Sequence, residues 1–174
     1  MPNALSNQQL LSITKISKSV VGHIQLGVRL TSASGLTVEQ LLEKACKDRF
    51  LFAQETLRAA KRFQPKPQPH HRLTIARAYY AMYHAARAAI FFVECGDDYE
   101  AHTELPKHIP DDFPDKAAWE NKLKTARLER NRADYDPYPK ADSAFSVAAA
   151  STLQDAKDFM IVVKAYLRRE GCLL

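Results

Sequence analysis

Residues 75–93 read IARAYYAMYHAARAAIFFV, and this stretch predicts a helix that is apolar on nearly every side. At about 100° per residue, alanines form one face where another helix can approach closely, and larger apolar side chains form a second face. A helix this apolar belongs at the centre of a bundle. The polar stripe between the two faces must therefore be hydrogen-bonded, ion-paired or directed toward a cleft. This stripe contains Arg77, Tyr80, His84 and Arg87.

A second stretch, RNRADYD at residues 130–136, supplies candidate partners for the stripe. Helical spacing places Arg127, Arg130 and Asp134 on the side that carries the large apolar residues of the same helix, so these charges are predicted to point inward. Two interpretations stay open. The arginines face a substrate, or Arg77, Asp134 and Arg130 form a buried ion network that joins two helices without catalysis.

Composition restricts the class of protein before any motif is considered. The 174 residues suit one domain, and 46% of them are hydrophobic, which is ordinary for a globular chain. The five glycines are too scattered for a Walker loop or a dinucleotide fingerprint. The net charge of +5 favours a polyanionic partner.

Three widely spaced cysteines predict reduced thiols in a cytoplasmic protein with no metal site, and no cofactor is predicted. No apolar run is long enough for a membrane span, and no signal peptide is visible, so no membrane association is predicted.

The pattern along the chain predicts an all-α protein, because no segment alternates as a strand would. Residues 1–36 contain no acidic residue and are interpreted as an N-terminal extension, with another helix over 5–28 or an arm on a partner subunit as alternatives. Residues 37–170 are predicted to form a helical bundle. Its four expected helices cover about 38–63, 72–94, 116–135 and 143–169. A Pro-rich connector at 64–71 separates the first two, and a loop over 95–114 with one helical turn separates the second and third. The expected N-caps are Thr37, Asp115 and either Asp142 or Ser143.

Three segments together resemble the HEPN domain family. They are RAYYAMYHAARA at 77–88, the loop with His102 and Thr103, and RNRADYD at 130–136, and the resemblance covers about residues 38–170. Within the family, the chain is most similar to a small prokaryotic branch whose genes often neighbour minimal nucleotidyltransferases. The resemblance implies an up-and-down bundle of four to five helices that forms a homodimer. Many members are metal-independent ribonucleases that act as toxins or in phage defence, so it also implies RNA or nucleotide as ligand and a nucleotidyltransferase antitoxin as partner.

The family's active motif is an arginine, a polar residue, three to five further residues and a histidine, and two copies meet at the dimer interface. Here the arginine is Arg130 and the polar residue is Asn131, but the histidine position is occupied by Tyr135. All six histidines of the chain precede this motif. A tyrosine exchanges protons near pH 7 only if neighbouring cations lower its pKa. His84 is the alternative proton shuttle, although an interior, hydrogen-bonded histidine is a simpler interpretation.

These observations predict a toxin-like RNA-binding protein with metal-independent endoribonuclease activity. The alternative is a non-catalytic HEPN module that binds nucleotide, RNA or a protein partner and acts through dimerisation, and a purely structural helical adaptor is a third possibility. The predicted catalytic residues are Arg130, Asn131, Tyr135 and His84, and the predicted substrate-binding residues are Arg77, Arg127, Arg132, Asp134 and Tyr80.

Overall fold

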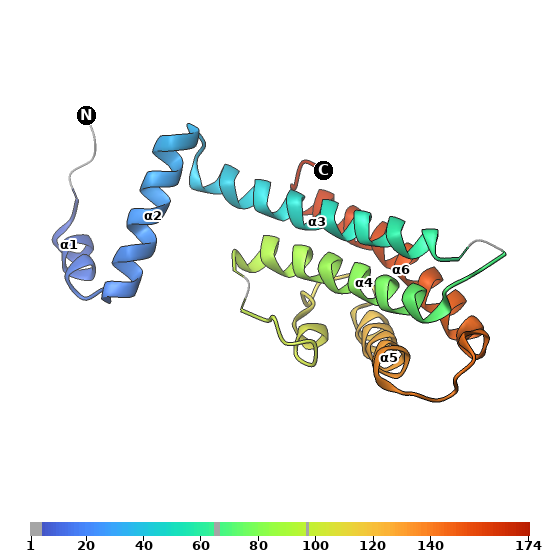
Figure 1. Ribbon diagram of the computed structural model, residues 1–174. Coiled ribbons are helices and arrows are strands. Elements are labelled where there is room, and N and C mark those ends of the chain that lie inside the picture. Colours follow the sequence, from blue (N-terminus) through green and yellow to red (C-terminus); the bar gives the residue numbers. More distant parts are fainter. Residues whose placement is uncertain (1–4, 65–66, 97) are drawn as a thin grey trace. The chain divides into compact units, whose positions relative to one another are not determined.

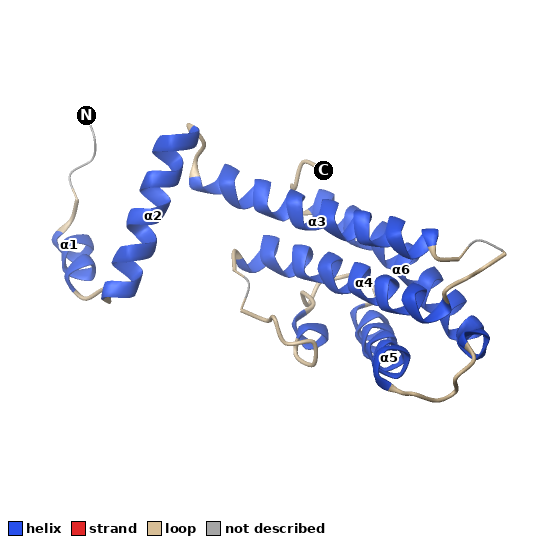
Figure 2. Ribbon diagram, viewed as in Figure 1, coloured by secondary structure: helices blue, strands red, loops and turns tan. Residues whose placement is uncertain are grey.

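The computed structural model describes residues 5–64, 67–96 and 98–174, and no strand occurs among them (Figure 2). The described chain is therefore all-helical, as predicted. It divides into two compact units, Met1–Leu41 and Leu42–Leu174. The elements are α1 (Asn7–Thr14), α2 (Lys18–Ser34), α3 (Val38–Arg62), α4 (His71–Glu94), α5 (Lys116–Tyr135) and α6 (Ser146–Arg169), with 3-10 turns η1 (Leu105–His108) and η2 (Asp142–Phe145).

The first unit consists of α1, α2 and the first turn of α3. Neither α1 nor α2 contains a buried residue, so the described part of this unit, residues 5–41, has no hydrophobic core of its own. The start of α3 follows the predicted capping box. The backbone N–H of Thr37 donates to Oε1 of Gln40 over 2.9 Å, and the backbone N–H of Gln40 donates to Oγ1 of Thr37 over 3.3 Å. The helix signal at Thr37 is thus confirmed.

The core of the second unit is built around α4, which lies between α3 and α5 in Figure 1 and packs against α6. Its alanine face is buried as expected, because Ala78, Ala81, Ala85 and Ala89 are at most 2% exposed. Close approach of α3 is shown by Cys46, whose Sγ donates to the backbone oxygen of Ala88 over 3.4 Å. The Sγ atom of Cys172, which follows α6, lies 4.0 Å from that of Cys46. Small residues on α4 therefore let neighbouring helices pack closely against it.

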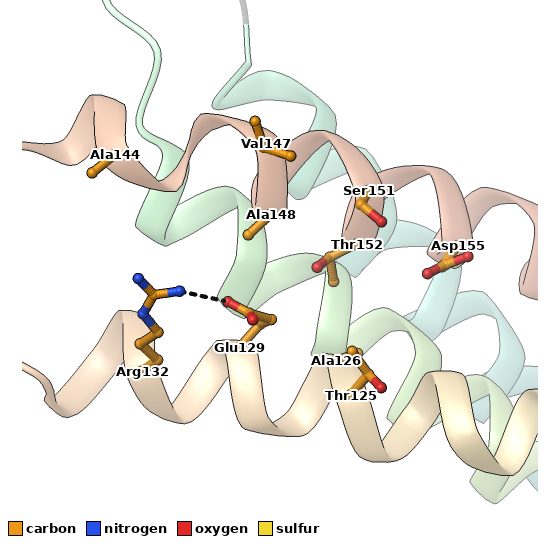
Figure 3. A pocket seen from close by; sticks show the side chains of 10 residues that line it. All are labelled: Thr125, Ala126, Glu129, Arg132, Ala144, Val147, Ala148, Ser151, Thr152 and Asp155. Carbon is orange, nitrogen blue, oxygen red and sulfur yellow. Dashed lines mark ion pairs between the residues drawn. The ribbon is translucent and has the colours of Figure 1, made fainter.

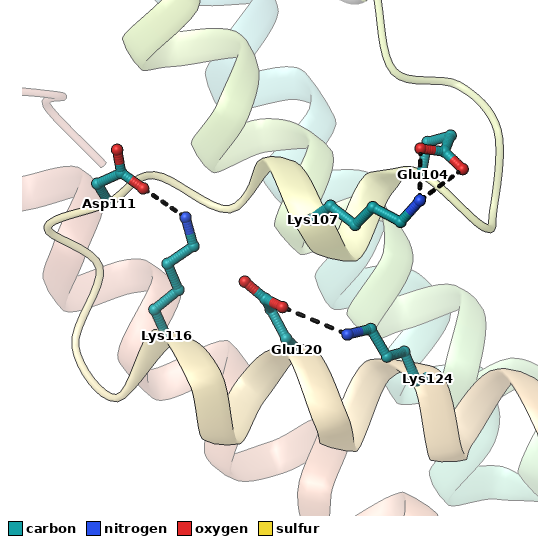
Figure 4. Close-up of polar contacts among 6 residues, drawn as sticks. All are labelled: Glu104, Lys107, Asp111, Lys116, Glu120 and Lys124. Atoms are coloured by element: carbon teal, nitrogen blue, oxygen red, sulfur yellow. Dashed lines mark hydrogen bonds and ion pairs between the residues drawn. The ribbon is translucent and has the colours of Figure 1, made fainter.

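The segment between α4 and α5 is fixed to the bundle by apolar anchors. Leu105, Ile109 and Phe113 are each at most 3% exposed. Asp112 adds a polar attachment, since it accepts a hydrogen bond from Tyr166 Oη over 3.0 Å and forms an ion pair with Arg169 of α6. Figure 4 shows three surface ion pairs along this segment and α5, of which the third is partly buried: Glu104–Lys107, Asp111–Lys116 and Glu120–Lys124. Ion pairs of this kind contribute little individually.

Helix α4 is capped by a residue that is distant in sequence. The carboxylate of Asp142 accepts hydrogen bonds from the backbone N–H groups of His71, over 2.7 Å, and Arg72, over 3.1 Å. We had predicted that Asp142 or Ser143 would cap the following helix, and this prediction is wrong because the carboxylate turns back to α4. Asp115 does lie at the N-cap position of α5, but it makes no capping side-chain hydrogen bond.

The Asp142→Asn variant is expected to lose about 1 kcal/mol of unfolding free energy at pH 7, because its amide has one acceptor oxygen where the two carboxylate oxygens each accept a backbone N–H group. Burial raises the pKa of the Asp142 carboxyl, but the hydrogen bonds from His71 and Arg72 outweigh this effect, so its pKa lies below its usual value. A depressed pKa stabilises the fold above the pKa of the unfolded chain, and this stability is lost as pH falls through the folded value. Denaturant unfolding from pH 7 down to pH 2 should show the difference from wild type shrinking with acidity. An unchanged difference at acidic pH would contradict this assignment, and Asp158→Asn is the matched control.

Candidate functional site

Arg130 of α5 joins α5 to α4 through its guanidinium group. Nη2 donates a hydrogen bond to the hydroxyl of Tyr80 on α4, and Nη1 donates to Oδ1 of Asn131 over 3.0 Å. Nε lies 2.8 Å from Oδ2 of Asp134, as an ion pair without the alignment of a hydrogen bond. The Arg130 side chain is only 14% exposed. The structure therefore brings together four residues that the sequence had proposed for the site.

Tyr135, which is exposed, extends the same group toward solvent. The guanidinium carbon of Arg130 lies 5.2 Å from the centre of the Tyr135 ring and 5.1 Å from the centre of the Tyr80 ring. Tyr135 is 69% exposed, whereas Tyr80 is partly buried. Arg130 thus lies near two phenol rings, the partly buried ring of Tyr80 and the exposed ring of Tyr135.

His102 joins this group from the segment between α4 and α5. Its Nδ1 atom lies 2.7 Å from the hydroxyl of Tyr79, which is 2% exposed. Its ring centre lies 4.3 Å from that of Tyr83 and 5.9 Å from that of Tyr80. The resemblance to HEPN domains had included His102 only as part of a loop, so its place beside the arginines was missed.

The electrostatics of this region are dominated by positive charge. Arg127 is partly buried, its Nε has no hydrogen-bond partner, and within the described residues no carboxylate forms an ion pair with it. Burial lowers the pKa of His102, and the charges of Arg130, Arg127 and Arg87 lower it further, so the imidazole is neutral at pH 7. We refer to Arg127, Arg130, Tyr79, Tyr80 and His102 as the arginine site.

Arg77 does not belong to the arginine site, although its position in the polar stripe had predicted that it would. Its side chain is exposed and makes no hydrogen bond or ion pair with the rest of the described chain. The connection between the start of α4 and the end of α5 is made instead by Arg72. Its Nη1 donates to the backbone oxygens of Ala133, over 2.7 Å, and Asp136, over 2.9 Å, and its Nη2 donates to that of Pro139 over 2.8 Å. The predicted ion network therefore does not include Arg77.

His84 packs among aromatic rings next to the arginine site. Its ring centre lies 4.5 Å from that of Phe52 and 6.2 Å from that of Tyr80, on which it is stacked. Burial, together with the charges of Arg87 and Arg49, lowers the pKa of His84 to about 4. Such a histidine is uncharged at neutral pH, partly buried and packed among aromatic rings, which favours the interior role over the proton shuttle.

Comparison with known proteins assigns the chain to no family. No protein-family model, no curated protein and no solved structure matches it. In the part of the chain that the structure describes, no three or more His, Cys, Asp or Glu side chains are grouped to hold a metal ion. None of its helices is long and apolar enough to cross a membrane. The functional argument therefore depends on the geometry and charge of the arginine site.

Arg132, which we had predicted to bind substrate, lies on the other side of α5 from Arg130. It lines a groove of about 360 Å³ between α5 and α6 (Figure 3). Its Nη1 lies 3.7 Å from Oε2 of Glu129, and its guanidinium carbon lies 5.2 Å from the centre of the Phe145 ring. Helical spacing separates residues 130 and 132 by about 200°, so Arg132 is not part of the arginine site.

Proposed function

We propose that this protein binds RNA through the arginine site. The observation that carries the proposal is Arg127, a partly buried guanidinium with an unpartnered Nε and no carboxylate ion pair within the described residues. A buried charge without a partner is costly, so such a group favours an anionic ligand. Arginine is well suited to a phosphodiester because its planar fork matches the phosphate oxygens.

Two further observations support RNA as the source of the phosphate. The net charge of +5 favours a polyanion over a small neutral ligand. The resemblance of residues 77–88 and 130–136 to HEPN domains favours RNA among polyanions, because both segments contribute to the arginine site through Tyr79, Tyr80 and Arg130. Under this proposal the protein is a HEPN-like, toxin-type module that acts as a homodimer and is controlled by a nucleotidyltransferase partner.

Metal-independent cleavage of the bound RNA is the second candidate function, and the exposed phenol of Tyr135 favours it. This phenol lies beside Arg130 at the family's histidine position and is 69% exposed, so a substrate can reach it. In such a reaction the ribose 2′-oxygen loses its proton to water and bonds to the phosphorus atom, and Arg130 and Arg127 stabilise the phosphorane. The bond from phosphorus to the 5′-oxygen then breaks, and Tyr135 gives its proton to this leaving oxygen and regains one from water. The products are a 2′,3′-cyclic phosphate and a free 5′-hydroxyl. Without this step, the same site is that of a non-catalytic RNA-binding module.

The proposal is tested by the affinity for a fluorescein-labelled single-stranded RNA, measured by anisotropy in EDTA. The Arg127→Ala/Arg130→Ala double variant is expected to bind roughly 10- to 100-fold more weakly than wild type, because two charge-assisted contacts are lost. Arg58→Ala/Arg62→Ala is the matched control, since it removes the same charge from an exposed face of α3. We expect less than about a 3-fold loss in this control, as screened surface charges contribute weakly.

The outcomes of this experiment are distinct. Equal losses in both double variants would show non-specific charge attraction and overturn the arginine site. Absence of binding by the wild type would overturn the proposed function itself. Gel analysis of the same RNA after incubation separates the two candidates, because cleavage fragments formed in EDTA identify the ribonuclease and an intact strand identifies the binding module.

A further inference from the structure

The hydroxyl of Tyr79 determines which nitrogen of His102 carries a proton. Burial raises the pKa of Tyr79, with a further contribution from Tyr83, so its hydroxyl stays protonated. A buried O–H group requires an acceptor. The partner that the structure gives it is Nδ1 of His102, 2.7 Å away. Since the hydroxyl donates this hydrogen bond, Nδ1 must supply the lone pair.

The remaining nitrogen of His102 is then a hydrogen-bond donor. A neutral imidazole carries one N–H group, and with Nδ1 as acceptor this group is at Nε2. Burial lowers the pKa of His102, and the charged side chains that face the ring, Arg130 and Arg127 on α5 and Arg87 on α4, lower it further, so the neutral imidazole is favoured. Glu100 of the same segment forms an ion pair with Arg87 over 3.3 Å. Nε2 makes no hydrogen bond within the described residues, so its N–H group lacks an acceptor there.

We propose that the Nε2–H group of His102 donates a hydrogen bond to a phosphate oxygen that Arg127 and Arg130 bind. An uncharged donor suits this position, because a fourth positive charge beside three guanidinium groups would be repelled. The proposal rests on the proposed function for RNA as the source of the phosphate. It also excludes His102 as the base that activates a 2′-hydroxyl, since the nitrogen with the lone pair is occupied by Tyr79. Tyr79 is the positioning residue, and His102 is the group that touches the ligand.

Nuclear magnetic resonance of the ¹⁵N-histidine-labelled protein tests the tautomer directly, with inorganic phosphate as the probe. In the wild type we expect the proton on Nε2 at pH 7, and the Nε2 resonance should shift as phosphate is added. The Tyr79→Phe variant keeps the ring but removes the hydroxyl, so the proton should distribute over both nitrogens. A purely structural role of Tyr79 would leave the tautomer unchanged. A wild-type proton on Nδ1, a doubly protonated ring, or no shift with phosphate would overturn the inference.

RNA affinity tests whether the same donor acts on the proposed ligand. His102→Ala is expected to weaken binding about 10-fold, as for the loss of one hydrogen bond to a charged group. His108→Ala is the matched control, because His108 lies on the same segment and stacks on Tyr99, with ring centres 3.4 Å apart. If His102→Ala binds RNA as wild type does while Arg127→Ala/Arg130→Ala fails, the inference is wrong and the proposed function stands. If wild type binds no RNA but phosphate shifts Nε2, the proposed function is wrong and the donor role stands.

Discussion

The Arg130→Ala variant should bind single-stranded RNA at least about 10-fold more weakly than wild type. The change removes the guanidinium and leaves Tyr80 and Asp134 without their partner on α5. Arg130→Lys should lose nearly as much, because a lysine retains the charge but lacks the planar fork that contacts several acceptors at once. Fluorescence anisotropy gives the affinities, and thermal unfolding shows whether the variants retain the fold.

Arg132→Ala is a close control for this prediction. It removes the same side chain two residues further along α5, on the side that faces the α5–α6 groove (Figure 3). Its affinity for RNA should stay within about 2-fold of wild type, since exposed charges far from the ligand are screened. Comparable losses in the Arg130→Ala and Arg132→Ala variants would show that net charge, rather than the arginine site, determines binding.

Arg72→Ala should lower the unfolding free energy by roughly 2–3 kcal/mol. The Arg72 guanidinium donates to three backbone oxygens at and beyond the end of α5, over 2.7–2.9 Å, and lies 4.1 Å from the centre of the Phe145 ring. Removing it leaves partly buried carbonyl groups without donors and takes away a cation–π contact. For a chain of this size the loss corresponds to a decrease in Tm of about 5–10 °C.

Arg77→Ala is the natural comparison, because Arg77 lies five residues further along the same helix and is exposed without a described contact. We expect its Tm to stay within about 2 °C of wild type, as for most surface substitutions. Differential scanning calorimetry measures the Tm of both variants and of wild type. A Tm for Arg72→Ala that matches the Tm for Arg77→Ala would mean that water replaces the Arg72 donors without loss.

The helices were predictable from sequence because their signals are local. The capping box at Thr37 marked the start of α3 correctly, and Lys116–Tyr135 matched the predicted third helix of the bundle. Asp142 shows where local rules fail. Its carboxylate had two helix starts within reach, and only the packed chain places the N–H groups of His71 and Arg72 beside it. A capping residue supplied by another segment leaves no pattern near the helix that it caps.

The candidate site was predictable only in part, for the same reason. Arg130, Asn131 and Asp134 are close along one helix, and Tyr80 followed from the polar stripe of α4. Helical spacing wrongly placed Arg77 at the site. The four residues of the polar stripe span about 80° around the helix, but this angle does not show where along α4 the neighbouring helix ends. The position of His102 depends on the fold of the segment after α4, which Leu105, Ile109 and Phe113 anchor to the bundle. The resemblance to HEPN domains pointed to the loop that contains His102, but it did not place the ring beside the arginines.

The burial of Cys46 and Cys172, whose Sγ atoms lie 4.0 Å apart, determines which thiols of this protein reactive small molecules can reach. Both thiols are inside, and burial raises the pKa of each, so neither presents a thiolate to the surroundings. Cys95, just beyond α4, is exposed. Peroxides and electrophiles dissolved in the surrounding water therefore encounter one cysteine thiol instead of three, and thiol oxidation of the folded chain begins at the end of its central helix.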